Sequence, residues 1–167
     1  MNSIFPQGKG WRAACIRYAP LILWTGIIFY LSSDMGSSEH TSRIIGPVLR
    51  FLFPDAAPET IAEFHGYIRK LAHLSEYALL ALIAARAAFS SPLSVVRNWW
   101  FLWALIYASL IAAADEFGQS FNPNRTGTPY DSLLDIVGAC FGIVAFTVLR
   151  SWLTSRQPQQ KSVAMDT

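Results

Sequence analysis

Four long apolar stretches limit what this chain can fold into. A helix that crosses the hydrocarbon core of a bilayer, about 30 Å thick, needs about 20 mostly apolar residues. The chain has such stretches at residues 13–33, 68–89, 97–117 and 130–152. Of its 167 residues, 53% are apolar and only 14% are charged, which is the wrong balance for a soluble domain of this size. The sequence therefore predicts an all-α protein, a polytopic membrane bundle of four transmembrane helices.

The connector between the first two stretches, residues 34–67, is too apolar to be a plain linker. Its apolar residues are accompanied by two arginines, Arg43 and Arg50, that can reach lipid headgroups. We therefore expect a short amphipathic, interfacial helix in this first connector. Pro58 has the position of a first helical residue, and the helix that it starts is expected to continue into the second apolar stretch and end near Phe89.

The chain is expected to form one membrane domain, residues 13–152. Residues 1–12 precede it as a polar segment, and residues 153–167 follow it as a disordered tail. Lysine and arginine in short loops accumulate on the cytoplasmic side of a membrane. With the N-terminus inside, eight of the 13 basic residues are cytoplasmic and five are extracytoplasmic. This bias predicts that both termini are cytoplasmic and that the first connector is extracytoplasmic.

Net charge and cysteine content exclude several functions. The net charge of +2 and the lack of a basic stripe argue against a nucleic-acid partner. The two cysteines, Cys15 and Cys140, lie far apart within or beside apolar stretches and have no metal-ligand spacing. We interpret them as small apolar residues.

Polar residues interrupt the apolar stretches at four places that meet in space. Because successive membrane helices alternate in direction, the first helix ends, the second begins, the third ends and the fourth begins on one side. The polar residues at these places are Ser32, Ser33, Lys70, His73, Glu76, Tyr77, Asp115, Glu116, Gln119, Asp131 and Asp135. A charge in hydrocarbon costs about 3 kcal/mol or more. The sequence therefore predicts one polar pocket, on the extracytoplasmic side.

Helical spacing supports this pocket. Lys70, His73 and Tyr77 follow one another at intervals of three and four residues, so they share a helix face. The same holds for two pairs four residues apart, Asp115 with Gln119 and Asp131 with Asp135. In the fourth stretch, two glycines four residues apart predict a close helix–helix contact; they are Gly138 and Gly142.

Ordinary structural roles compete with the functional interpretation. His73 could be a hydrogen-bonded core histidine, and Asp131 could simply cap the fourth helix. Arg125 could be an ordinary loop arginine. Asp115 and Glu116 are harder to explain in this way, because carboxylates at a helix C-terminus oppose the helix dipole. Unless the helix continues past them, a cation such as Arg125 or Lys70 must offset them.

Taken together, these residues resemble the VanZ-like family of small bacterial membrane proteins. The resemblance covers about residues 20–150, and its pieces are Ser32-Ser33, Lys70-Leu-Ala-His73-Leu-Ser-Glu76-Tyr77, Asp115-Glu116-Phe-Gly-Gln119-Ser-Phe, Arg125, Asp131, Asp135 and Gly138. One departure is Asp135, where asparagine is expected more often. The resemblance implies a multi-pass protein of the bacterial inner membrane. The family's namesake is linked to resistance to the glycopeptide teicoplanin, which does not by itself make this chain a resistance factor.

The pocket suggests action on, or binding of, a lipid or lipid-linked cell-envelope molecule. In the enzyme interpretation the candidate catalytic residues are His73, Glu76, Asp115, Glu116 and Asp131, with His73 as general acid or base. The candidate substrate-binding residues are Lys70, Tyr77, Gln119, Arg125 and Asp135. Mixed nitrogen and oxygen ligands of this kind also suit a divalent cation, although no standard metal motif such as HExxH is present.

Two other classes of function fit the same residues. The protein could bind and modulate an envelope component without turnover, with Lys70 and Arg125 contacting phosphate or carboxylate. It could also be part of a transporter or flippase, with the carboxylates as a proton relay. Four helices are few for alternating access, so that alternative requires oligomers. The sequence does not decide whether the protein is an enzyme.

Overall fold

The computed structural model describes residues 10–33, 38–120 and 129–163, with side chains left undescribed at 38–40, 129–131 and 157–163. These ranges contain helices and no strand. The helices are α1 (Trp11–Ser32), α2 (Ser38–Leu52), α3 (Pro58–Phe89), α4 (Ser94–Asn98), α5 (Trp100–Gln119) and α6 (Pro129–Val163).

The predicted fold class is confirmed. Four of the described helices are long and apolar enough to cross a membrane: α1, α3, α5 and the Ser132–Arg156 part of α6. The chain is a multi-pass membrane protein. The third span differs in one detail, because the five-residue α4 precedes α5 where the sequence suggested a single helix from residue 97.

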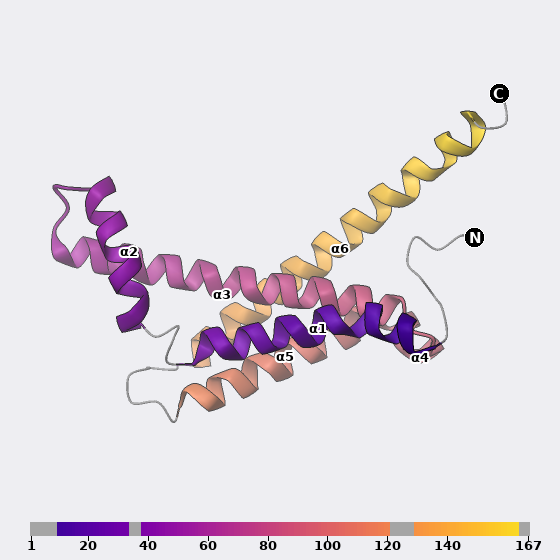
Figure 1. The fold of residues 1–167 in the computed structure, drawn as a ribbon, viewed down its shortest axis with the longest axis horizontal. Helices are drawn as coiled ribbons and strands as arrows, with labels where there is room; N and C mark the ends of the chain where they lie inside the picture. The colour runs from indigo at the N-terminus through magenta and orange to yellow at the C-terminus, as the bar shows by residue number, and fades with distance from the viewer. Residues whose placement is uncertain (1–9, 34–37, 121–128, 164–167) are drawn as a thin grey trace.

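Helix α3 is the central element of the fold. It packs against α1, α2, α4, α5 and α6. Its 32 residues make it about 48 Å long, well beyond the thickness of a bilayer core. Its N-terminal part therefore extends past the ends of α1 and α5, and α2 leans against this extension (Figure 1). The expected continuation of one helix from Pro58 to Phe89 is confirmed.

The expected amphipathic helix in the first connector is α2. Leu49 is buried on its α3 side, and the ring of Phe53, just past its end, lies 5.3 Å from that of Phe64 on α3. The apolar residues Ile44, Val48 and Phe51 are exposed instead. Such a helix is stable only where its exposed apolar side meets another apolar phase, as at the surface of a bilayer.

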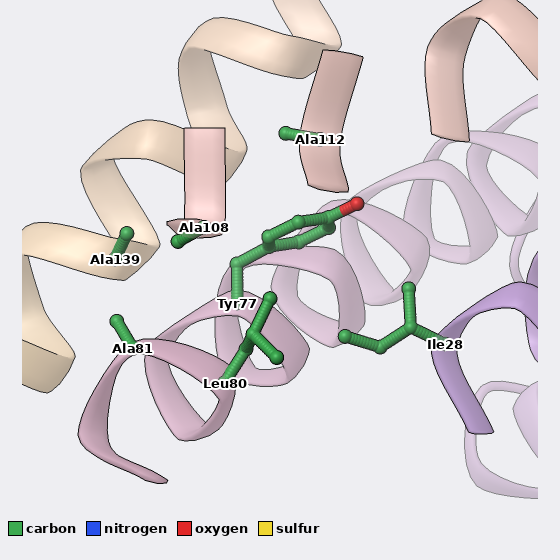
Figure 2. Packing of buried hydrophobic residues seen from close by; sticks show 7 residues of the cluster. All are labelled: Ile28, Tyr77, Leu80, Ala81, Ala108, Ala112 and Ala139. Carbon is green, nitrogen blue, oxygen red and sulfur yellow. The ribbon is translucent and has the colours of Figure 1, made fainter. Parts of the chain in front are cut away.

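Small residues let the spans approach closely. The core around Tyr77 and Leu80 is filled mainly by alanines from α3, α5 and α6 (Figure 2). A β-carbon at Gly138 would overlap the backbone carbonyl oxygen of Leu74, and one at Gly142 would overlap that of Ala78. The predicted close contact at these two glycines is therefore confirmed, and it joins α6 to α3.

Helix α6 is longer than expected. It continues past residue 152 to Val163, into the segment for which the sequence suggested a disordered tail. Nothing between Trp152 and Arg156 stops a helix, since glycine and proline are absent there. The C-terminal part of α6 runs away from the other spans (Figure 1).

Candidate functional site

The polar residues of α1 and α5 line a cavity where both helices end. This is the end of the bundle at which α6 begins (Figure 1). The cavity has a volume of about 240 Å³ and is lined by Phe29, Ser32, Ser33, Ala114, Asp115, Gly118 and Gln119. Its lining combines apolar residues with hydroxyl, amide and carboxylate groups. Such a cavity can take a small polar group attached to an apolar chain.

Asp115 is the centre of a hydrogen-bond network at this cavity. Its side chain is buried, at 4% exposure. Gln119, one turn later on α5, donates from Nε2 to Asp115 Oδ2 at 2.8 Å and to Ser32 Oγ at 2.7 Å. The Tyr77 hydroxyl donates to the same carboxylate oxygen over a longer 3.5 Å. One carboxylate thereby connects α3 and α5, and Gln119 extends the network to α1.

Tyr77 belongs to both the apolar core and the polar network. It is fully buried. Its ring lies among Ile28, Ala108 and Ala112 (Figure 2). Its position also brings it within electrostatic range of Glu76 and Asp135. The Asp115 network therefore lies close to the polar residues of α6.

His73 and Asp135 form a second polar pair, between α3 and α6. His73 Nδ1 lies 3.7 Å from Asp135 Oδ1, and the histidine side chain is 24% exposed whereas the aspartate is buried. The glycine contact explains this position. Gly138 lies three residues after Asp135 and touches the backbone of Leu74, which directly follows His73.

Comparison of the sequence with models of protein families identifies the family of this chain. The sequence model of the VanZ/LLP1 family matches residues 18–150. The chain belongs to the VanZ/LLP1 family. Searches of curated proteins and of solved structures each found no significant match. The matched region includes every residue of the two polar groups described above, so the candidate site of this VanZ/LLP1 protein lies within the part of the chain that carries the family's sequence pattern.

Five of the ten residues predicted for the site take part in these two polar groups. Tyr77, Asp115 and Gln119 share one network, and His73 pairs with Asp135. Glu76 is half-buried and precedes Tyr77 in the sequence, and Glu116 is half-buried and follows Asp115. Lys70, on α3, is exposed. Arg125 and the side chain of Asp131 lie outside the described residues.

Asp115 does not lie at the C-terminus of its helix in this VanZ/LLP1 protein. Helix α5 continues for four residues past Asp115, to Gln119. The carboxylate is therefore one turn inside the helix, where neutral donors from Gln119 and Tyr77 hold it. A buried carboxylate can be stabilised in this way by hydrogen bonds. The cation that the sequence suggested as its counterpart is not required for Asp115.

Sequence reasoning missed one residue that shapes the site. Trp24, in the first span, was not among the residues predicted for the site. In the structure its Nε1 donates to the backbone oxygen of Glu76 at 3.0 Å and so ties α1 to α3 beside the polar groups. A tryptophan within an apolar stretch carries no sequence signal for such a contact, because the acceptor is a backbone group on another helix.

A metal centre has little support in the described part of the chain. Among these residues there is no group of three or more histidine, cysteine, aspartate or glutamate side chains placed to hold an ion. His73 and Asp135 supply two ligand types that a divalent cation accepts. Two protein ligands are fewer than a stable site for such an ion normally has.

Proposed function

We propose that the pocket binds the polar headgroup of a lipid or lipid-linked cell-envelope molecule, and that His73 exchanges a proton with it. The observation that carries the proposal is the burial of two carboxylates at one end of a membrane bundle, Asp115 in the wall of an open cavity and Asp135 beside His73. Buried charge is costly in a membrane protein, and it marks ligand pathways and proton-transfer sites more often than packing.

The His73–Asp135 pair supports the proton-transfer part. Asp135 faces Nδ1 of the imidazole. A carboxylate in that position orients the ring and favours a proton on Nδ1, which leaves Nε2 to accept a proton from a ligand hydroxyl or a water. The distance of 3.7 Å is longer than a hydrogen bond, and such contacts often tighten when a ligand binds. Any role in glycopeptide resistance would follow from this binding and is proposed at the family level.

Replacing His73 with glutamine tests the proton-transfer step. Protein in phosphatidylglycerol vesicles is given a polyprenyl phosphate or a polyprenyl-linked saccharide, and bound and converted lipid are measured by mass spectrometry. The wild type is expected to bind and convert one of these probes. His73→Gln is expected to lower conversion by about a hundredfold or more, the usual contribution of a general acid–base residue, with binding changed by less than about threefold.

The matched control is Glu63→Gln, an exposed residue on the same helix, which should leave binding and conversion unchanged. Wild-type protein that binds neither probe would contradict the proposal. Wild-type protein that binds without converting would contradict the proton-transfer step and favour binding without turnover. The Asp115 network agrees with that alternative, because neutral donors from Gln119 and Tyr77 already hold the carboxylate in place. A transporter component is the third alternative.

We also propose that the pocket faces the extracytoplasmic side of the inner membrane, with both termini in the cytoplasm. Charge distribution supports this orientation. Ten of the eleven acidic residues lie in residues 34–76 or 115–135 of the sequence, and those whose side chains the structure describes lie toward the pocket end. At the opposite end of the bundle, the charged residues that the structure describes are all basic. They are Arg12, Arg17, Arg86, Arg97 and Arg150, and Arg156 follows farther along α6. Basic residues mark the cytoplasmic side.

Reporter fusions test the orientation. Alkaline phosphatase is active only outside the cytoplasm. Fused after Asn124, between α5 and α6, the enzyme is expected to be active, and fused after Ser91, between α3 and α4, it is expected to be inactive. The opposite activities at the two positions would overturn the proposed orientation while leaving the pocket itself unaffected.

A further inference from the structure

A second, larger groove lies between α2 and the projecting start of α3, separate from the candidate site. Its volume is about 470 Å³, and it is lined by Ser42, Arg43, Gly46, Pro47 and Arg50 of α2 and Pro58, Ile61, Ala62 and His65 of α3. None of these nine residues is acidic. Two arginines and a histidine therefore face one groove that the proposed function does not use.

Helix α2 places this groove at a membrane surface. The lining residues of α2 lie along one side of the helix, whereas the exposed apolar residues Ile44, Val48 and Phe51 follow at intervals of four and three along another. An amphipathic helix with this division lies in the plane of the interface, with its apolar side among the acyl chains. Leu49 and the Phe53–Phe64 contact fix α2 on α3, so the groove opens at the depth of the lipid headgroups.

The groove has the chemistry of a phosphate site. Arg43 and Arg50 are seven residues apart, about two turns or 10 Å along α2, so their long side chains can converge on a single phosphate. Guanidinium groups bind phosphate oxygens through paired hydrogen bonds. His65 Nε2 lies 3.2 Å from Thr41 Oγ1, which positions the imidazole at the same wall.

We propose that this groove binds the phosphate of an anionic phospholipid, whose acyl chains lie beside Ile44, Val48 and Phe51. Charge complementarity selects an anionic headgroup, and the exposed apolar side of α2 selects a lipid over a soluble phosphate. The bound lipid holds α2 at the interface. The inference does not depend on the function of the Asp115 pocket.

Localised photo-crosslinking tests the inference. The full-length protein is placed in vesicles of equal phosphatidylglycerol and phosphatidylcholine that contain a trace of one or the other lipid with a photoreactive headgroup. Adducts are mapped by peptide mass spectrometry, so that lipid at the arginine-rich opposite end is counted separately. Phosphatidylglycerol is expected to label residues 41–65 in preference to phosphatidylcholine. Arg43→Gln with Arg50→Gln is expected to reduce this labelling roughly thirtyfold, as two neutralised basic residues at an anionic lipid surface should.

Three comparisons make the test decisive. The double variant Arg12→Gln with Arg97→Gln removes the same amount of charge at the opposite end of the bundle and should leave labelling of residues 41–65 unchanged. Asp115→Asn, in the candidate site, should also leave this labelling unchanged. The single exposed change Arg50→Gln, which leaves the fold intact, should give an intermediate loss. Equal labelling by the two lipids, unchanged labelling in the Arg43 and Arg50 variants, or complete competition by inorganic phosphate would each overturn the inference.

Discussion

Gly142→Ala is expected to lower the free energy of unfolding by about 3 kcal/mol, the upper end of the range for overpacking. The reason is the nature of the neighbour. The new methyl group would meet the backbone carbonyl of Ala78, which cannot rotate away as a side chain can. Helices α3 and α6 must therefore separate, and their small-residue contact is lost. Alanine also favours a helix over glycine by about 1 kcal/mol, so the observed loss would come from packing alone.

The chain offers a matched control for this change. A β-carbon at Gly26, in the middle of the α1 span, would meet nothing within 4 Å. Gly26→Ala is therefore expected to be neutral or slightly stabilising. Unfolding of the two variants in detergent, followed by circular dichroism, makes the comparison. If both variants unfold like the wild type, the close contact between α3 and α6 is not what holds the bundle together.

The Asp115→Asn variant is expected to fold like the wild type and to bind the ligand more weakly. Both hydrogen bonds described for the carboxylate are accepted by Oδ2, from Gln119 and Tyr77. An asparagine oxygen in the position of Oδ2 accepts both of these hydrogen bonds. The other carboxylate oxygen is replaced by an amide NH₂ group, and the negative charge is lost. Removing a buried charge tends to maintain or increase stability at a functional site. Binding of the polyprenyl-linked saccharide, whose hydroxyl groups can donate to the carboxylate, is expected to fall about ten- to a hundredfold, the value of a hydrogen bond to a charged group.

Melting temperature and probe binding are measured on the same preparations, with Glu63→Gln as the charge-matched control on an exposed surface. A melting temperature that holds or rises while binding falls would assign Asp115 to the ligand. Binding that declines only in proportion to the amount of folded protein would mean that Asp115 supports the bundle, and the binding role should then be abandoned.

Part of the candidate site follows from local geometry and could be predicted. Asp115 and Gln119 are four residues apart on one helix, so their contact needs no other element. The position of the polar ends of α1, α5 and α6 also follows, because alternating spans place these ends on one side. The partner of His73 could not be predicted in this way. From the sequence we expected Asp115 or Asp131 beside His73, and the structure places Asp135 Oδ1 3.7 Å from its Nδ1.

The sequence by itself determined the number, type and approximate bounds of the spans, and it indicated the family. The physical reason is that a bilayer leaves a long apolar stretch few choices other than a helix, since its backbone groups must bond within the segment. The tertiary structure decided which polar groups meet. That depends on how far α6 slides along α3, and the backbone contacts of Gly138 with Leu74 and of Gly142 with Ala78 set this register. Contacts between helices some 60 residues apart are not a local property, so no spacing in the sequence could have revealed the His73–Asp135 pair.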